Sequence, residues 1–369
     1  MDQPAQEKKP RRRVSAKKRA LFALFTLTVL LGGTEAFFQV REVVRARRKP
    51  RLPTMPHDYL GIALVPGASY DRPAQNRKMS INAYGMRGPE VGEKQPGKLR
   101  ILCVGGSTTF GLYASSNEST WPARLEQLAS SRGATLEVIN AGAPGWTSRA
   151  SMTNLELRGF SLKPDVLVCY HAYNDLMSNL EDAYVAESKV DDIQELYHPR
   201  VTSVFEHSAL YRFLRSRLRS PYDAFKQKAD TLREVGIESF ARNLQRLVRR
   251  AREIGAKPVL CTFPTCFRPT LEESRRDQLP ELEEWYGSLC PITYPHLIEG
   301  LRRYNETVRA VAKELQVPLV ELEAVFPRDV ALYHSPLHHS DAGERKVAEL
   351  VLAKLEAEKL VTLGAAPPK

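Results

Sequence analysis

The sequence predicts an α/β fold built on an open, doubly wound parallel sheet. From residue 98 onward, short apolar segments alternate with longer segments that have the spacing of amphipathic helices. The short segments are rich in Val, Leu and Ile without polar alternation, which is typical of parallel strands covered on both faces. Such sheets carry their functional residues at the carboxyl ends of the strands. The expected strands are LRILCVG (99–105), LEVIN (136–140), DVLVCYH (165–171), KPVLCTF (257–263) and VPLVEL (317–322).

Four segments between and after these strands are expected to be helices, because their apolar residues fall on one face and their charges on the other. They are residues 120–131, 240–255, 301–315 and 342–360. Residues 176–235 do not follow the alternation and are expected to be an insertion after the third strand. The seven aromatic residues of this insertion either line a substrate pocket or form a small satellite core.

The positive charge of the chain is concentrated at its N-terminus. The whole chain has a net charge of +11, and residues 1–52 hold fourteen basic and four acidic side chains. The remaining residues therefore carry 40 basic and 39 acidic side chains and are close to neutral. A nucleic-acid-binding protein needs clustered positive charge on its folded domain, so no nucleic-acid partner is expected.

An apolar segment at about residues 20–38 lies between two basic clusters. Glu35 is the only charged residue between Arg19 and Arg41. The strongly apolar part, residues 20–33, is shorter than the roughly 20 residues of a full membrane span. This segment therefore predicts either a cleaved signal peptide or an uncleaved signal anchor, and both place the body of the protein outside the cytoplasm.

The residues at the C-terminal end of the apolar segment bear on the choice between signal peptide and anchor. Thr34, Glu35 and Ala36 fit a small-x-small cleavage site, which is typical of a signal peptide. Phe37 and Phe38 extend the apolar length, which favours a retained anchor. On this length we expect a single-pass anchor, with a cleaved, secreted form as the alternative.

The first predicted strand ends in a glycine turn, Gly105-Gly106, that is followed by Ser107. The two glycines are adjacent, so the turn is not the GxGxxG motif of dinucleotide-binding proteins. A P-loop needs a lysine directly after the glycine at Gly111, where this chain has leucine, and the nucleophile elbow GxSxG needs a glycine in place of Thr109. A lone serine in such a turn is usually a turn or cap residue.

Three further strand ends carry polar groups that change this interpretation of the serine. The second strand is followed by NAGAPGWTS (140–148), the third by YND (173–175), and the last helix is preceded by SPLHHSDAG (335–343). Together these loops supply backbone amides, an amide side chain and histidines at one edge of a sheet. Acyl transfer from an ester needs that set, because a serine attacks, a histidine takes its proton and donors hold the oxyanion.

This ordered set resembles the SGNH (GDSL-like) hydrolase family over about residues 98–355. The resemblance implies a flavodoxin-like, three-layer α/β/α sandwich with a central parallel sheet of about five strands. It implies Ser107 as nucleophile, His338 as base, and the Ser107 amide, the Gly145 amide and Asn174 as oxyanion donors. It also implies a serine esterase or acyltransferase that needs no cofactor and acts on an acylated small molecule or glycan.

The stretch INAYGMRGPE (81–90) is similar to membrane-anchored bacterial members of that family that carry GGST in place of GDS. This similarity implies an inner-membrane protein whose catalytic domain lies in the periplasm. The expected organisation is a basic tail with the anchor at 1–52, an irregular lead-in at 53–97, a hydrolase domain at 98–360 and a loose tail at 361–369.

Three residues depart from the family pattern. Gly106 replaces the aspartate of GDS, Ala172 replaces the glycine of GxND, and Ser335 replaces the aspartate that usually orients the histidine. The orienting group is then either Ser335, in a serine–histidine dyad, or a carboxylate from elsewhere. Asp175 and Asp341 are the nearest carboxylates in the motifs, and Asp341 is expected to cap the last helix instead. We favour the dyad.

The cysteines and the remaining histidines predict no metal site, because no CxxC pair or Cys/His cluster has zinc spacing. Cys266 and Cys290 are a candidate disulfide in an oxidising compartment, with two free thiols as the alternative. His171 is expected in the core and His339 is expected to be solvated.

The function that the sequence predicts is a membrane-tethered esterase outside the cytoplasm that removes O-acetyl groups from a cell-surface glycan. One alternative is an O-acyltransferase of envelope polysaccharide, which would use the same acyl-enzyme. A second alternative is an inactive binding module with the shape of the family, to which the missing aspartate gives weight.

Overall fold

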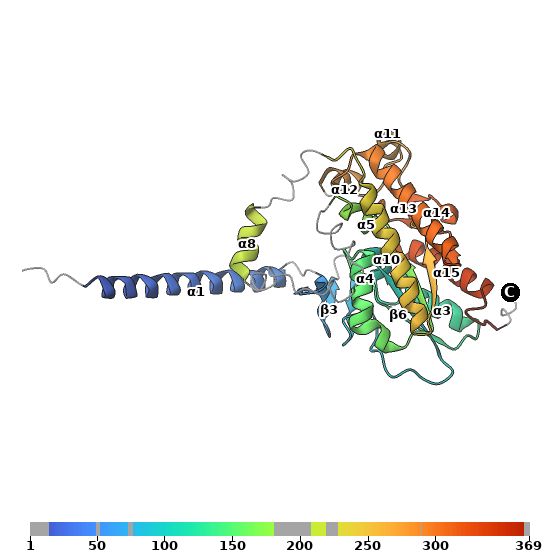
Figure 1. Cartoon of the computed structure of the whole chain (residues 1–369), viewed down its shortest axis with the longest axis horizontal. Helices are drawn as coiled ribbons and strands as arrows, with labels where there is room; N and C mark the ends of the chain where they lie inside the picture. The colour runs from blue at the N-terminus through green and yellow to red at the C-terminus, as the bar shows by residue number, and fades with distance from the viewer. Residues whose placement is uncertain are drawn as a thin grey trace, which may run out of the picture. The chain divides into compact units, whose positions relative to one another are not determined.

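The computed structural model describes residues 15–48, 52–72, 77–180, 208–218, 228–288 and 290–364. The chain divides into two compact units. The smaller unit comprises residues 1–49 and 204–218, and the larger comprises residues 50–203 and 219–369. Figure 1 labels elements of both units and colours the chain from blue at the N-terminus to red at the C-terminus.

The larger unit contains a five-stranded sheet in which every neighbouring pair of strands is parallel. The strand order β6-β5-β7-β8-β9 is the 2-1-3-4-5 order of flavodoxin-like folds. The predicted fold class is therefore confirmed. The strands are β5 (Leu99–Gly105), β6 (Leu136–Asn140), β7 (Val166–Tyr170), β8 (Lys257–Cys261) and β9 (Leu319–Val320).

Two groups of helices flank this sheet and bury it. In one group α3 packs on α15, and in the other α10 lies beside α13, α4 and α5 (Figure 1). The long helices bury apolar residues at helical spacing, as Phe240, Leu244, Leu247 and Ala251 do in α10. The bounds are α3 (Trp121–Ser131), α4 (Ser148–Asn154), α5 (Tyr173–Ser178), α10 (Glu234–Glu253), α13 (Tyr294–Glu314) and α15 (Asp341–Ala357).

Shorter helices complete the larger unit. A π-helical turn at Leu155–Gly159 and a 3-10 turn at Phe160–Leu162 extend α4, and a second 3-10 turn lies at Val330–Leu332. The remaining helices among the described residues of this unit are α2 (Ser107–Phe110), α11 (Leu271–Arg276), α12 (Leu282–Ser288) and α14 (Leu322–Val325).

The strand order reverses between β5 and β7, which creates a crevice at their carboxyl ends. From β5 the chain crosses to β6 on one side of the sheet and then returns to β7 on the other. Ligands of doubly wound folds bind at this position, since no connection covers it. Ser107 lies two residues after the end of β5 and Asn174 lies four residues after the end of β7, so the fold places both residues at the crevice.

The segment ahead of the sheet is not the irregular lead-in that the sequence predicted. It forms two antiparallel hairpins, β1 (Thr54–His57) with β2 (Gly61–Leu64), and β3 (Ser69–Arg72) with β4 (Arg77–Ser80). Strands of four residues are too short to show a clear period, which is why sequence patterns missed them. The hairpins share a small hydrophobic core with the segments that follow the strands of the sheet. Residues from both sides form this core: Leu64, Tyr70, Met79, Ile81, Phe110 and Trp146.

The structure contradicts one further expectation about the larger unit and part of another. At 361–364 the expected loose tail is packed, because Val361 is buried and the Gly364 N–H donates to the Arg132 carbonyl at 2.6 Å, whereas 365–369 lie outside the described residues. All five cysteines are described, and all are buried and free. The Cys290 thiol donates instead to the Ile292 carbonyl at 3.3 Å, so the expected bridge to Cys266 is absent.

The described part of the smaller unit contains two helices, α1 (Ala16–Arg48) and α8 (Ala209–Leu218). Within α1, Ala16–Arg41 is long and apolar enough to cross a membrane, with a mean hydropathy of 1.8 and no buried residue. Helix α8 belongs to the predicted insertion at 176–235. Of the seven aromatic residues of that insertion, only Tyr211 and Phe213 lie in the described part of the chain.

Candidate active site

Ser107 stands at the first position of α2 and is separated by Gly106 from the end of β5. The two preceding positions have no room for a side chain. A Cβ atom at Gly105 would lie 2.0 Å from Thr109 Oγ1, and one at Gly106 would lie 2.4 Å from Asn174 Nδ2. The adjacent glycines therefore let the strand turn into the helix while Asn174 approaches the serine.

His338 links Ser107 to Ser335 through its two ring nitrogens. Ser107 Oγ lies 2.8 Å from His338 Nε2, and Ser335 Oγ lies 2.8 Å from His338 Nδ1. The Ser335 hydroxyl also accepts the backbone N–H of His338 at 3.2 Å. Ser335 is buried at 2% exposure, whereas Ser107 and His338 are partly exposed. Ser335, which replaces the aspartate of the family pattern, thus contacts the ring nitrogen of His338 that faces away from Ser107.

The two candidate carboxylates bind other partners. Asp175 accepts hydrogen bonds from the Ser148 N–H, at 3.1 and 3.0 Å, and from the Ser148 hydroxyl at 2.5 Å. Asp341 accepts from the Ser115 N–H at 2.9 Å and from the Ser115 hydroxyl. Among the described residues, no carboxylate forms an ion pair with His338.

The role expected of Asp341 as a helix cap is also wrong. The cap of α15 is Ser340, whose side chain accepts the Gly343 N–H at 3.3 Å. Asp341 is the first residue of the helix and reaches across to Ser115. Sequence spacing alone cannot separate two adjacent polar residues at a helix start, because both residue types are common there.

The three expected oxyanion donors lie in the segments that follow β5, β6 and β7: Ser107 begins α2, Gly145 lies in a turn and Asn174 lies in the first turn of α5. Asn174 Nδ2 donates one hydrogen to the Trp146 carbonyl at 2.8 Å, which leaves its second hydrogen available. Gly145 precedes that tryptophan in an exposed turn with φ of 79°, which a glycine adopts without strain. The backbone N–H groups of Ser107 and Gly145 have no acceptor among the described residues.

A small pocket opens beside Ser107. Its empty volume is about 250 Å³, which includes the open mouth. Ser107, Asn174 and His338 line it together with Gly106 and Ala172. The other walls are largely aromatic or aliphatic: Tyr170, Tyr173, Phe263 and Leu337. Within the described residues, no three His, Cys, Asp or Glu side chains converge as a metal site.

Burial keeps the site histidine neutral. The pKa of His338 is lowered from 6.5 to about 4, chiefly because burial disfavours the charged ring, with further contributions from His334 and Arg77. At neutral pH the Nε2 atom can therefore accept a proton from Ser107. The same cause lowers the pKa of His171 to about 3, and His171 is buried in the core as the sequence predicted.

Most of the rim of the site has no signal in the sequence. Tyr113 stacks on His334 with ring centroids 3.9 Å apart, and its centroid lies 5.1 Å from that of His338. The Arg77 guanidinium lies over the Tyr113 ring at 4.4 Å, and Arg77 Nη2 is 3.3 Å from His334 Nε2. The Tyr113 hydroxyl donates to Glu281 at 3.0 Å. These residues come from separate segments, and no motif connects them.

His339 is not the solvated neighbour that the sequence predicted. It is 1% exposed and packs against the rings of Phe326 and Tyr333. Its Nε2 atom lies 3.2 Å from the Tyr170 hydroxyl. His339 forms an antiparallel bridge with Tyr333, and adjacent residues of extended chain point to opposite sides. His338 therefore faces the crevice while His339 faces the core.

The family model of the GDSL-like lipase/acylhydrolase family matches residues 103–346, which is more than half of the 369-residue chain. The chain belongs to this family. It is a carboxylic ester hydrolase of the serine type, and the matched region includes every motif from the glycine turn to the histidine loop. None of the curated proteins compared with the hydrolase matches it.

Solved structures similar to the hydrolase share little sequence with it. A lipase/acylhydrolase from Enterococcus faecalis is 16% identical, with a TM-score of 0.43 over 73% of this chain and 100% of that chain. An acetylxylan esterase from Geobacillus stearothermophilus is 15% identical, with a TM-score of 0.42 over 72% and 95%. An alpha/beta hydrolase enzyme from the metagenome of Lake Arreo, Spain, is 17% identical, with a TM-score of 0.43 over 70% and 95%.

Proposed function

We propose that the hydrolase is anchored by α1 in a bacterial inner membrane and cleaves an ester in the periplasm through a Ser107 acyl-enzyme. The observation that carries the mechanism is the 2.8 Å contact between Ser107 Oγ and His338 Nε2 beside an open pocket. The length and hydropathy of Ala16–Arg41 support the anchor.

In this mechanism Ser107 Oγ attacks the ester carbonyl carbon while His338 Nε2 takes the hydroxyl proton. The Ser107 N–H, the Gly145 N–H and Asn174 Nδ2 hold the oxyanion that forms. The bond to the alcohol then breaks, and His338 returns the proton to the leaving alcohol. Water attacks the acyl-enzyme in the same way and releases the acid together with free Ser107.

Ser335 takes the orienting role of the missing aspartate in this proposal. When His338 Nε2 accepts from Ser107, Nδ1 carries the hydrogen and donates it to Ser335 Oγ, 2.8 Å away. The hydroxyl thus selects the tautomer that a general base needs. It supplies no negative charge to stabilise the imidazolium, which predicts lower turnover than in an enzyme with the carboxylate.

The proposed substrate is a short acyl ester, for which an O-acetyl group on a cell-surface glycan is the simplest case. The pocket beside Ser107 is small, and Tyr170, Tyr173 and Phe263 close its apolar side. An acetyl group fits such a pocket, and each added methylene would have to displace packed aromatic rings. Activity should therefore fall steeply as the acyl chain grows.

The nucleophile is tested with a serine-directed fluorophosphonate on the full chain. The unmodified protein should be labelled, and Ser107→Ala should abolish labelling. Ser130→Ala is the matched control, since Ser130 is an exposed serine on α3. Equal labelling of the Ser107→Ala variant would disprove the assignment. Turnover of acetyl, butyryl and octanoyl esters, with and without an acceptor glycan, then tests the chain length and separates hydrolysis from transfer.

The topology is tested with reporters fused near residue 364. A reporter that is active only after export should be active there, and a reporter that needs the cytoplasm should be silent. The opposite pair of results would contradict the periplasmic location.

A further inference from the structure

Glu35 is the only charged residue in the apolar core of α1, and its carboxylate binds the start of α8. It accepts the Ser208 hydroxyl at 2.7 Å, the Ala209 N–H at 2.7 Å and the Leu210 N–H at 3.0 Å. These donors belong to the first turn of α8, whose N–H groups have no partner within the helix. The negative charge also meets the positive end of the helix dipole. The contact therefore satisfies both the carboxylate and the helix start.

The next turn of α1 adds an aromatic contact with the same helix. Phe38 stacks on Phe213 with ring centroids 4.4 Å apart and an interplanar angle of 29°. The Arg41 guanidinium lies over the Phe213 ring, 5.1 Å from its centroid. Ala209 is fully buried. Three residues of α1, spaced three apart on one face, thus bind one helix of ten residues.

The depth of this contact in a membrane depends on the geometry of α1. Arg41 ends the apolar stretch, and an arginine at the end of a span extends to the lipid headgroups. Glu35 lies six residues earlier, which is about 9 Å along the helix axis. Amphipathic helices lie at about 5 to 10 Å into the boundary between headgroups and acyl chains. In a membrane crossed by α1, this distance would place the contact with α8 at that boundary.

The sequence of α8 is suited to that position. ALYRFLRSRL contains three arginines and no acidic residue, together with five large apolar or aromatic residues. Leu214, whose side chain is described, is 46% exposed. A helix with this composition gains from burying its apolar residues among acyl chains while its arginines meet negatively charged headgroups.

We propose that α8 is an interfacial helix that binds an anionic lipid surface and is held there by Glu35 of the membrane anchor. The proposal rests on the membrane anchor of the proposed function. It explains why a carboxylate persists in the apolar segment, because Glu35 is fully hydrogen-bonded where an unpaired charge would be costly. It also requires that α1 is retained, since cleavage after Ala36 would remove Glu35.

The test places a fluorescent label on α8 in the full-length protein. Leu214→Cys carries an NBD group, and the matched control is Ile254→Cys at the end of α10, where the side chain is 38% exposed. The five native cysteines are buried, which favours labelling of the added thiol. The labelled proteins are reconstituted in vesicles of anionic or zwitterionic phospholipid that contain a doxyl-lipid quencher.

We expect the label at Leu214 to lose most of its emission in anionic vesicles and the label at Ile254 to lose little. Glu35→Ala should remove most of the difference in quenching between the two label positions. Thr26→Ala should retain this difference, because the Thr26 hydroxyl donates to the Phe22 carbonyl of its own helix. Equal quenching at the two positions, or quenching that is unchanged in Glu35→Ala, would overturn the proposal. Equal quenching in zwitterionic vesicles would overturn its preference for anionic lipid.

Two measurements on the same samples separate this inference from the proposed function. Sedimentation with the vesicles reports the anchor, and turnover of a soluble ester reports the active site. Vesicle-bound, active protein with an unquenched label at Leu214 would disprove the interfacial helix and leave the proposed function intact. Protein that does not sediment with vesicles would disprove the anchor and the interfacial helix together.

Discussion

In the described part of the hydrolase, two serine–histidine pairs have the same distance between the hydroxyl oxygen and Nε2 but different surroundings. Ser107 Oγ lies 2.8 Å from His338 Nε2, and Ser151 Oγ lies 2.8 Å from His171 Nε2. In each pair a third residue lies near Nδ1 of the ring. At the first pair it is an uncharged serine, and at the second it is Asp175, whose Oδ2 is 3.8 Å from His171 Nδ1.

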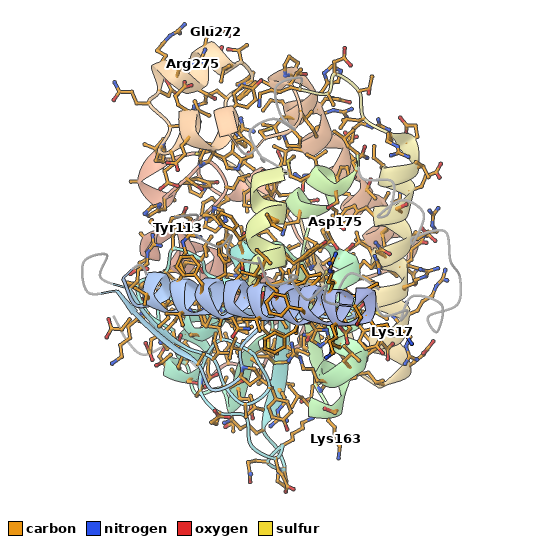
Figure 2. All side chains as sticks on the ribbon, turned by 90° about the vertical axis from the view of Figure 1, so that its left-hand side faces the viewer. Lys17, Tyr113, Lys163, Asp175, Glu272 and Arg275 are labelled. Atoms are coloured by element: carbon orange, nitrogen blue, oxygen red, sulfur yellow. The ribbon has the colours of Figure 1, made fainter. Side chains whose placement is uncertain are left out.

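In the pair with the carboxylate, the serine and the aspartate are out of reach of substrate, although His171 borders the pocket beside Ser107. Ser151 and Asp175 are fully buried and His171 is 3% exposed, and Asp175 lies within the body of the larger unit (Figure 2). The Asp175 carboxylate, which belongs to α5, accepts hydrogen bonds from Ser148 in the first turn of α4 and so links the two helices. Ser107 instead lines an open pocket at a helix start. A serine–histidine distance therefore does not identify a nucleophile, whereas access and nearby oxyanion donors do.

The largest expected effect separates the two serines directly. Ser107→Ala should lower kcat for a soluble acetyl ester by at least about a thousandfold, because the acyl-enzyme cannot form. Ser151→Ala should leave kcat within a few-fold and lower the free energy of unfolding, because the buried His171 loses its partner. Comparable losses of kcat in both variants would contradict the distinction, and urea unfolding shows whether each variant is folded.

The oxyanion side of the exposed pair is tested at Gly106. A Cβ atom in Gly106→Ala would lie 2.4 Å from Asn174 Nδ2 and displace that amide. Loss of one oxyanion donor typically costs about 10²- to 10³-fold in kcat. Gly92→Ala is the matched control, since no atom lies within 4 Å of a Cβ built there. Combining Gly106→Ala with Asn174→Ala should add little to either alone, and full additivity would show that the two act separately.

Transferring the carboxylate to the exposed pair should raise activity. Ser335→Asp places a negative charge next to His338 Nδ1 and should raise kcat about tenfold or more, given that removing such a charge can cost about four orders of magnitude. The aspartate should also raise the pKa of His338. Unchanged turnover in Ser335→Asp, together with loss of activity in Asp175→Asn or Asp341→Asn, would place the orienting acid elsewhere.

Asp341 should matter more for stability than for rate. Asp341→Ala leaves the Ser115 N–H without its acceptor and removes one of the two partners of the Ser115 hydroxyl, at a cost of about 1 to 3 kcal/mol in the free energy of unfolding. The kcat should change by less than about threefold, since no contact links Asp341 to His338. Ser115→Ala provides the partner for a double-mutant cycle in urea. A rate loss that exceeds the stability loss would make Asp341 a candidate orienting acid again.

The smallest expected effect is on the pH profile. The pKa of His338 is about 4, so the acid limb of kcat/KM should lie near pH 4 instead of 6.5. Arg77→Gln should move that limb upward by less than about one unit, because the Arg77 charge disfavours protonation.

The same pKa determines how His338 affects stability. Its pKa is lower in the folded protein than in the unfolded chain, so the unfolded chain binds more protons between about pH 6.5 and pH 4. The free energy of unfolding should therefore fall as the pH is lowered through this window. The free energy of unfolding of a His338→Gln variant should fall less over the same window. If kcat/KM instead falls with an acid limb near pH 6.5, His338 has its ordinary pKa and burial does not lower it.

The sequence predicted the parts of the molecule that local patterns encode. The strands 99–105 and 136–140 were placed residue for residue, since continuous apolar runs between turns indicate buried strands. The motif order brought Ser107, Asn174 and His338 to one edge of the sheet, and the structure places all three at one pocket.

What the sequence could not predict depends on contacts between distant segments. Arg77, Tyr113 and Glu281 meet at the rim, although 204 positions separate the first from the last. The same limit explains the wrong disulfide, because a separation of 24 positions fixes neither the distance nor the direction of two thiols. Which of two adjacent polar residues caps a helix is decided by its packing, as at Ser340.

The hairpins that precede the sheet have a consequence for how the protein can be shortened. The family match begins at residue 103, yet the Trp146 indole donates to the carbonyl of Ile62 in β2 at 2.8 Å. Trp146 is also the acceptor of Asn174 and the neighbour of Gly145. A soluble fragment trimmed to the matched region would expose this indole and release the oxyanion turn. Fragments for expression or crystallisation should therefore begin near residue 52, and we expect a shorter fragment to have lower esterase activity.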